Sequence, residues 1–195
     1  EDQAVGPITV ALSDADSPAA ELSVRVQSPT AALLAASGIL VGGFGPTRAL
    51  ILNPLPDAVG NAVITLEVTD PTGFKSQRAF GYVVTPVNDA PSFVKGPDVQ
   101  VLEDSGAYQK AWASGISAGP ANEASSQSVR FVVEADHPEL FSTPPAITPA
   151  GVLSFTPAAQ ANGSSVVRVT LQDTGGTANG GVDTSAVQTF VIRVE

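Results

Sequence analysis

The sequence predicts an all-β protein made of two tandem β-sandwiches arranged end to end. Short runs rich in Val and Thr alternate with polar residues, and 16 Pro and 18 Gly are spread between them, as is typical of short strands joined by turns. The chain also repeats one pattern, first in NPLPDAVGNAVITLEVTDPTG from Asn53 and again in TPAAQANGSSVVRVTLQDTGG from Thr156. No stretch keeps an apolar helical period long enough for a substantial helix.

The internal repeat has a fixed spacing. Four pairs of residues are each 103 positions apart: Pro54/Pro157, Gly60/Gly163, Asp70/Asp173 and Gly73/Gly176. A constant offset over four such pairs indicates two copies of one structural unit. The copies differ near their ends, where the second carries the extra stretch TANGGVD before its last strand.

Matching strands are expected in the two copies. Apolar residues occupy every second position over 64–69 and over 167–172, so one face of each strand points into a core. Two further strands of the first copy have expected counterparts in the second. Leu22-Val24-Val26 corresponds to Val129-Phe131-Val133, and Phe80-Tyr82-Val84 corresponds to Phe190-Ile192-Val194. The best helix candidate is TAALLAAS from Thr30, limited to one or two turns.

The strand count indicates sandwiches of the immunoglobulin type, which have about seven short strands in roughly 100 residues. The absence of Cys excludes the disulfide-bridged antibody variety, and Trp112 lies too early in its copy to be the core Trp of that variety. We predict domains at residues 1–90 and 91–195, with the boundary at the sequence NDAP.

Several motifs resemble cadherin repeats. The stretch EDQAVGPITVALSDADSP from Glu1 resembles the opening of such a repeat, with an acidic residue on the first strand. LEVTDPTG from Leu66 resembles the segment before the last strand, and VNDAP resembles a shortened linker between repeats. In the second copy, ISAGPANEA and LQDTGGTANGGVDTS are similar to the immunoglobulin-like or cadherin-like repeats of large bacterial surface proteins.

The resemblance implies that Ca²⁺ ions brace the joints between repeats. Ca²⁺ takes six to eight oxygen ligands from carboxylates, Asn side chains and carbonyls. Carried over by motif, the ligands fall into three groups. The joint between the copies would use Glu1, Asn88, Asp89 and Asp173, with Asn122 and Glu123 as further candidates. Asp14, Asp16 and Asp70 would face a preceding repeat, and Glu103 and Asp104 would face a following one.

The departures from the cadherin pattern argue against a full three-ion joint. The second copy has GPANEAS where the first has Asp14-Ala-Asp16, and around NPLPD only Asp57 stands in for the usual carboxylates. Two alternatives remain at this joint: a single bound ion, or a calcium-free joint packed by Pro and apolar residues.

The same residues also fit structural roles that need no ligand. Asp70-Pro71-Thr72-Gly73 and Asp14-Ala-Asp16-Ser17-Pro18 are good turn sequences, because Asp caps turn backbone and Gly or Pro sets its dihedral angles. Asn162-Gly163-Ser164 matches a glycosylation acceptor but is also a favoured turn pair. His137 is expected in a loop. Trp112 is either a core or interface residue or an exposed platform for sugar.

Composition and motifs exclude several function classes. The net charge of −10 argues against a nucleic-acid or anionic-membrane surface, and the lack of a long apolar run argues against membrane insertion. A Ser-His-Asp site would have to use His137, and no G-x-S-x-G elbow surrounds any Ser. We therefore expect no enzyme, but a monomeric piece of a longer extracellular or cell-surface polypeptide.

Two non-catalytic functions remain open. The first is a structural spacer in a large bacterial surface protein or adhesin, whose partners are neighbouring repeats of the same polypeptide. The second is a glycan- or protein-binding module attached to a secreted enzyme or adhesin, in which the loop TGGTANGGVD contacts the partner. The spacer is favoured because no cluster of aromatic residues marks a sugar platform.

Overall fold

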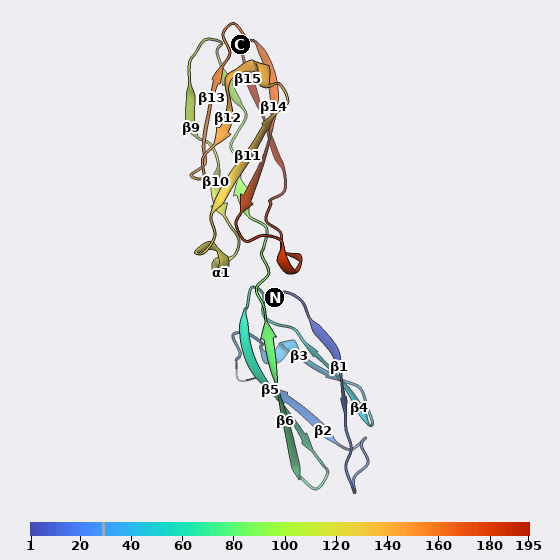
Figure 1. The fold of residues 1–195 in the computed structure, drawn as a ribbon. Coiled ribbons are helices and arrows are strands. Elements are labelled where there is room, and N and C mark those ends of the chain that lie inside the picture. The colour runs from blue at the N-terminus through green and yellow to red at the C-terminus, as the bar shows by residue number, and fades with distance from the viewer. Residues whose placement is uncertain (29) are drawn as a thin grey trace. The chain divides into compact units, whose positions relative to one another are not determined.

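A computed structural model describes residues 1–28 and 30–195 of the chain. The chain divides into two compact units, Glu1–Pro86 and Val87–Glu195. The linker residues Asn88 and Asp89 therefore belong to the second unit. Both units are built almost entirely of strands (Figure 1), which confirms the all-β class and the β-sandwich units.

The first unit packs two three-stranded sheets against each other. One sheet has the order β1-β4-β3 and the other has the order β2-β5-β6. Their bounds are β1 Val5–Ala11, β2 Ser23–Gln27, β3 Ile39–Gly42, β4 Thr47–Leu52, β5 Gly60–Thr69 and β6 Lys75–Val84. Where the sequence favoured a short helix, the chain instead forms turns and the 3-10 helix η1 at Ala36–Gly38.

The second unit has sheets of order β11-β14-β15-β8 and β12-β13-β9, with the short pair β10-β7 beside them. Its strands are β7 Ser92–Val94, β8 Val99–Val101, β9 Tyr108–Ala111, β10 Ser114–Ser117, β11 Val129–Ala135, β12 Phe141–Ile147, β13 Val152–Pro157, β14 Gly163–Asp173 and β15 Gln188–Val194. Its helical turns are α1 Ala121–Ala124, η2 Pro138–Leu140 and η3 Ala178–Gly180.

The expected alternation of buried and exposed residues along the long strands is confirmed, and the structure adds their pairing. In the first unit Val24 pairs with Val68 and Ile64 with Phe80, and in the second Val167 pairs with Phe190. Alternate residues of β5 and β14 enter the two cores, where the side chains of Ile64 and Val167 are fully buried. Period-two alternation thus determines which face of each long strand is covered.

The strand β1 is the first unit's equivalent of β9. β1 pairs with β4 and β9 pairs with β13, so β1 occupies in its unit the place of β9. At the repeat offset of 103, the stretch that would match β7 and β8 falls before the first residue of the sequence. Glu1 therefore lies before the strand equivalent to β9, and not on the first strand of a repeat as its motif suggested.

Candidate metal-binding poles

Three acidic residues gather at one end of the first unit. Asp14 and Asp16 lie in the loop after β1, and Asp70 follows β5. Each can offer a carboxylate oxygen within 4.8 Å of the others, although all three side chains are exposed or only half-buried. The structure thus brings together the three residues that the sequence assigned to one pole.

The acids of this cluster already support their own turns. Asp14 Oδ1 accepts hydrogen bonds from the backbone N of Asp16 (3.3 Å) and of Ser17 (3.0 Å). Asp70 Oδ1 accepts from the N of Phe74 at 2.8 Å, and both its oxygens lie within 2.9 Å of the Thr72 hydroxyl. Turn formation therefore accounts for these residue types without an ion.

The negative charges of the cluster interact. A hydrogen bond with Asp16 lowers the pKa of Asp14, together with bonds from the backbone of Asp16 and Ser17. The same contact and the charge of Asp14 raise the pKa of Asp16, with a smaller contribution from Asp70. A divalent cation relieves this kind of repulsion, and it competes with the proton on Asp16.

A second cluster lies at the end of the second unit where the linker enters. The Asn88 side chain donates from Nδ2 to Asp173 Oδ1 at 3.0 Å and to Val182 O at 2.8 Å. Its Oδ1 accepts from Gln127 Nε2 at 2.7 Å. Asp173 Oδ1 also accepts from the backbone N of Gly175 at 2.8 Å. Asn88 and Asp173, predicted as ligands from different motifs, are thus in direct contact.

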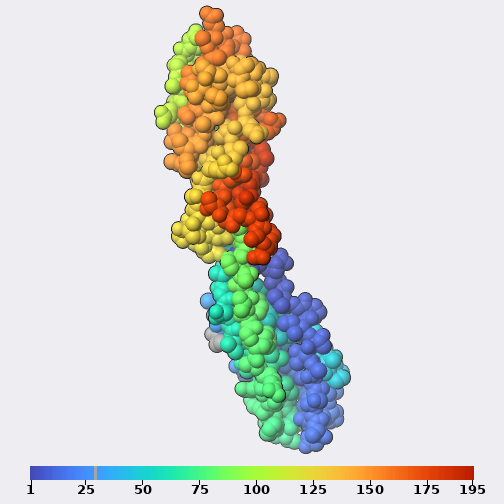
Figure 2. Space-filling model, viewed as in Figure 1, coloured from blue at the N-terminus to red at the C-terminus, as the bar shows by residue number. Residues whose placement is uncertain are grey.

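Glycines in the segment after β14 make room for Asn88. A Cβ added to Gly175 would lie 1.7 Å from Asn88 Oδ1, and one added to Gly181 would lie 2.9 Å from Asn88 Cβ. The backbone N of Val182 also donates to Asn88 O at 2.8 Å. The Gly-rich loop that the sequence offered as a partner-binding surface therefore packs around the linker Asn; it appears in red at the end of the second unit in Figure 2.

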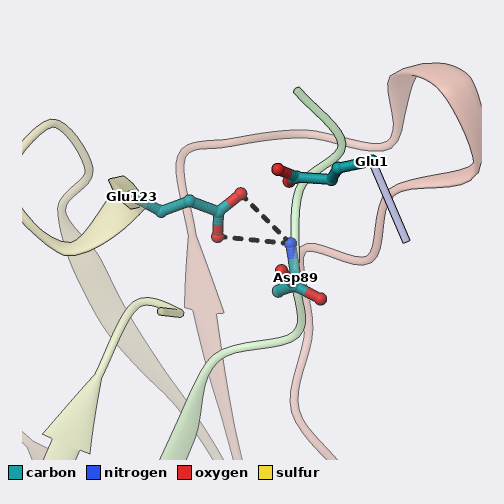
Figure 3. Close-up of side chains that lie close together, drawn as sticks. All are labelled: Glu1, Asp89 and Glu123. Atoms are coloured by element: carbon teal, nitrogen blue, oxygen red, sulfur yellow. Dashed lines mark hydrogen bonds between the residues drawn. The ribbon is translucent and has the colours of Figure 1, made fainter. Parts of the chain in front are cut away.

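Glu123 holds the next linker residue. Its two carboxylate oxygens accept from the backbone N of Asp89 at 3.3 and 3.2 Å (Figure 3). The Glu123 side chain is 6% exposed. It packs so closely on Gly119 that a Cβ there would lie 2.2 Å from Oε2. The four-residue helix α1, which begins after Pro120, places Glu123 in this position.

Two buried oxygens of this second cluster have no hydrogen-bond partner among the described residues. They are Asp173 Oδ2 and Gln127 Oε1. Buried polar atoms without partners are rare because desolvation costs roughly 1–3 kcal/mol each, and an ion or a water is a common explanation. Gln127 was missed by sequence reasoning, since a single Gln in the stretch SSQS carries no signal.

The remaining predicted ligands have local structural partners. The amino group of Glu1 donates to Thr85 O at 2.8 Å. The Asp104 carboxylate accepts from the backbone N of Gln160 at 3.3 Å, and the backbone N of Glu103 donates to Glu195 O. The bond to Glu195 places Glu103 beside the last residue of the chain, and Figure 1 shows that end of the chain at the opposite end of the second unit from α1.

Asp2 makes in the first unit the same kind of contact that Asp104 makes in the second. Asp2 Oδ1 accepts from the backbone N of Asp57 at 3.0 Å, in the position that Asp104 and Gln160 occupy in the second unit. All four residues have positive φ angles of 55–58°. Each pair therefore fixes two strained turns, and Asp57, considered from sequence as a substitute ligand, contributes its backbone N–H to this contact.

The only His is not arranged for nucleophilic catalysis. His137 Nδ1 lies 2.9 Å from Glu139 Oε1, and both side chains are exposed. The hydroxyl of Ser165 instead accepts from the His137 backbone N and donates to Asp136. Trp112, 7% exposed, packs on Phe190 with ring centroids 4.3 Å apart, so its expected role in a core is confirmed.

No helix in the described parts of the chain has the length and hydrophobicity of a bilayer span. The α-helix α1 has four residues, whereas a spanning helix takes about 20.

No protein-family model matches the sequence, and no curated protein matches it either. Solved structures with a similar fold include form II of human protocadherin-24 EC1-2, at 17% identity over 90% of this chain and 82% of that chain, with a TM-score of 0.58. Drosophila N-cadherin EC1-4 is similar at 17% identity over 92% of this chain, with a TM-score of 0.54. This chain spans 42% of that one. The expected resemblance is confirmed: the chain has the fold of tandem cadherin repeats.

Proposed function

We propose that this chain is a non-catalytic, extracellular repeat pair that acts as a spacer in a large surface protein and is stabilised by Ca²⁺ at the pole where the linker enters the second unit. The observation that carries the proposal is Asp173 Oδ2, a buried carboxylate oxygen with no hydrogen-bond partner among the described residues. It belongs to a side chain whose other oxygen already contacts Asn88.

The chemistry of this pole suits Ca²⁺. Carboxylates of Asp173, Asp89 and Glu123 and the amide oxygens of Asn88 and Gln127 are hard oxygen donors, which Ca²⁺ accepts in irregular geometry. No His and no Cys lies in this group, so softer transition metals have no preferred ligand there. The bonds of Asn88 to the loop after β14 hold the linker in place before an ion arrives.

The exposed cluster of Asp14, Asp16 and Asp70 is a second, weaker candidate. Its ligands are close together, but all are in water and engaged in turns. Glu1, Glu103 and Asp104 have backbone partners in their own units, and we propose no separate ion for them.

A spacer function is favoured over a partner-binding module. The loop TGGTANGGVD contacts Asn88 through Gly175, Gly181 and Val182, although residues 177–180 remain exposed. Trp112 lies in a core, and its ring is closed to a sugar. The burial of Trp112 removes one of the sequence features on which the binding-module alternative depended.

Thermal unfolding with and without Ca²⁺ tests the proposal. The single Trp lies in the second unit, so its fluorescence follows that unit alone. We expect unfolding free energy to rise with free Ca²⁺ as RT ln(1 + [L]/Kd), which is about 2.7 kcal/mol at 100 times Kd. MgCl₂ at equal ionic strength controls for charge screening.

The variant Asp173→Asn should remove most of the calcium-dependent gain, because an amide replaces the carboxylate that faces the ion. Glu134→Gln, which neutralises an exposed acid on β11, is the matched control and should respond to Ca²⁺ as the unaltered chain does. Equal stabilisation by Ca²⁺ in Asp173→Asn and Glu134→Gln, or none in any form, would leave these acids with structural roles only.

A further inference from the structure

The strand β3 is an unprotected sheet edge in the first unit. It is the last strand of the order β1-β4-β3 (Figure 1), and no strand in the described ranges 1–28 and 30–195 pairs with its outer side. It pairs with β4 at four consecutive positions without a bulge, and its sequence ILVG contains no charge and no Pro. Proteins usually blunt such edges with Lys, Pro or a bulge, because the free backbone groups pair with other strands.

The equivalent edge of the second unit is protected. β4 and β13 are equivalent, since Leu50 lies 103 positions before Leu153, so β12, the partner of β13, is the counterpart of β3. β12 contains Pro144-Pro145, and its register shifts twice along β13. Residues 92–101 pair with β10 and β15, and no described strand lies on the outer side of β12. The open side of β3 therefore follows from the sheet order and does not depend on which residues precede the first unit.

Backbone groups of β3 face the open side. Gly38 O accepts from the N of Asn53 at 2.8 Å, which places these two residues in a hydrogen-bonded position of the ladder with β4. Such positions recur at every second residue, so Leu40 directs its N–H and C=O to β4, while Ile39 and Val41 direct theirs outward. The N–H of Ile39 closes the 3-10 helix η1. Ile39 O and both backbone groups of Val41 are left to bond an added strand.

Exposed apolar side chains surround this edge. Leu40 is 49% exposed, Val41 is 39% exposed, and Phe44, in the hairpin loop after β3, is 77% exposed. The strands β1, β3 and β4 contain one charged residue, Arg48, whose buried side chain bonds backbone carbonyls. The edge is thus apolar and uncharged in a chain whose net charge is −10. Patches of this kind are typical of protein–protein contacts.

We propose that two copies of the chain associate through β3, which pairs antiparallel with β3 of the second copy about a twofold axis at Val41. In this register the N–H of each Val41 donates to the O of the other, so free donors meet free acceptors. Leu40 of each copy lies opposite Gly42 of the other, where an added Cβ would meet no atom within 4 Å, so the Leu side chain has room.

Charge favours a second copy as the occupant. Two chains that each carry −10 repel wherever their acids face one another, and like charges directly opposite in a sheet are destabilising. The β3 edge brings two copies together without such a contact. Because the contact is small, the association is weak, with a Kd on the order of 100 μM. The monomer expected from sequence is thus the dilute form of the chain.

Sedimentation equilibrium of the full chain, from micromolar to millimolar concentration, measures the association. EDTA in the buffer makes the result independent of any metal site. The average mass should rise with concentration from 19.7 kDa toward twice that value. Hydrogen exchange at the Val41 amide should slow over the same range, whereas exchange at Leu40, whose amide faces β4 in both states, should change little.

Two Lys substitutions give a matched pair. Leu40→Lys places a charge beside the axis in each copy and should weaken association at least tenfold. Val63→Lys makes the same change at a 54% exposed position of β5, in the other sheet, and should leave association unaltered. Val41→Pro removes the outward N–H, a change that edge strands tolerate, and should also prevent pairing. If Val41→Pro does not fold, the two Lys variants decide the matter.

Several outcomes would overturn the proposal. A monomer mass at millimolar concentration would leave this edge to a different partner. Equal weakening by Leu40→Lys and Val63→Lys would assign the effect to charge in general. A dimer that persists in Leu40→Lys, or exchange at Val41 that does not change with concentration, would place the contact between copies elsewhere on the chain.

Discussion

Replacing Ser165 by Ala removes a hydroxyl that is fully buried on β14. The hydroxyl accepts a hydrogen bond from the His137 backbone N at 3.1 Å and donates one to Asp136 Oδ1 at 3.0 Å. The backbone N of Val166 donates to the same Asp136 oxygen at 2.7 Å. Ser165 therefore joins the end of β11 to β14, the strand in the centre of the larger sheet.

The expected loss is about 1–3 kcal/mol of unfolding free energy in the second unit, the typical cost of leaving a buried donor without its acceptor. Part of the loss depends on pH. Burial raises the pKa of Asp136, but hydrogen bonds from Ser165 and the Val166 amide outweigh it, so the pKa lies below its ordinary value. The stability that the ionised Asp136 contributes is present above its unfolded-state pKa and is lost as pH falls through its folded-state pKa. The effect of Ser165→Ala should therefore shrink in acid.

Urea unfolding followed by Trp112 fluorescence measures the change. With a urea slope of about 2 kcal/mol per molar, the midpoint should fall by roughly 0.5–1.5 M at neutral pH. Ser164→Ala, at an exposed neighbouring position, is the control and should leave the midpoint nearly unchanged. Equal midpoints for the two variants, or a larger effect of Ser165→Ala in acid than at neutral pH, would refute this account of the contact.

Two other outcomes follow from the described contacts. Leu66 is 8% exposed in the first unit, and Val169 is fully buried in the second. Replacing either residue by Ala should lower the unfolding free energy of its own unit by about 2–4 kcal/mol. Calorimetry that shows either change in the other unit would contradict separate cores. A hydrogen bond with Glu139 raises the pKa of His137, so Glu139→Gln should reduce stability below about pH 6.5 and not above the folded-state pKa. An unchanged His137 titration by NMR in that variant would show that the contact does not form.

The long strands were predictable because their signal is local. Period-two alternation fixes which side chains of β5 and β14 are buried, and the constant offset of 103 then fixes the equivalent positions in both copies. The short strands β1 and β9 were harder to place. Their partners lie some 40 residues away in the chain, and the bulge between Val5 and Ile8 shifts the register of β1. Alternation alone does not say which of two short strands begins a repeat.

The candidate pole was only partly predictable. Asn88, Asp89 and Asp173 were found because each stands in a motif, whereas Gln127 has no motif and reaches Asn88 only through the fold. The glycines of the loop after β14 carried a usable signal: Gly175 and Gly181 leave no room for a Cβ beside Asn88. A loop rich in Gly indicates either an exposed flexible loop or a close backbone approach, and sequence cannot separate these two.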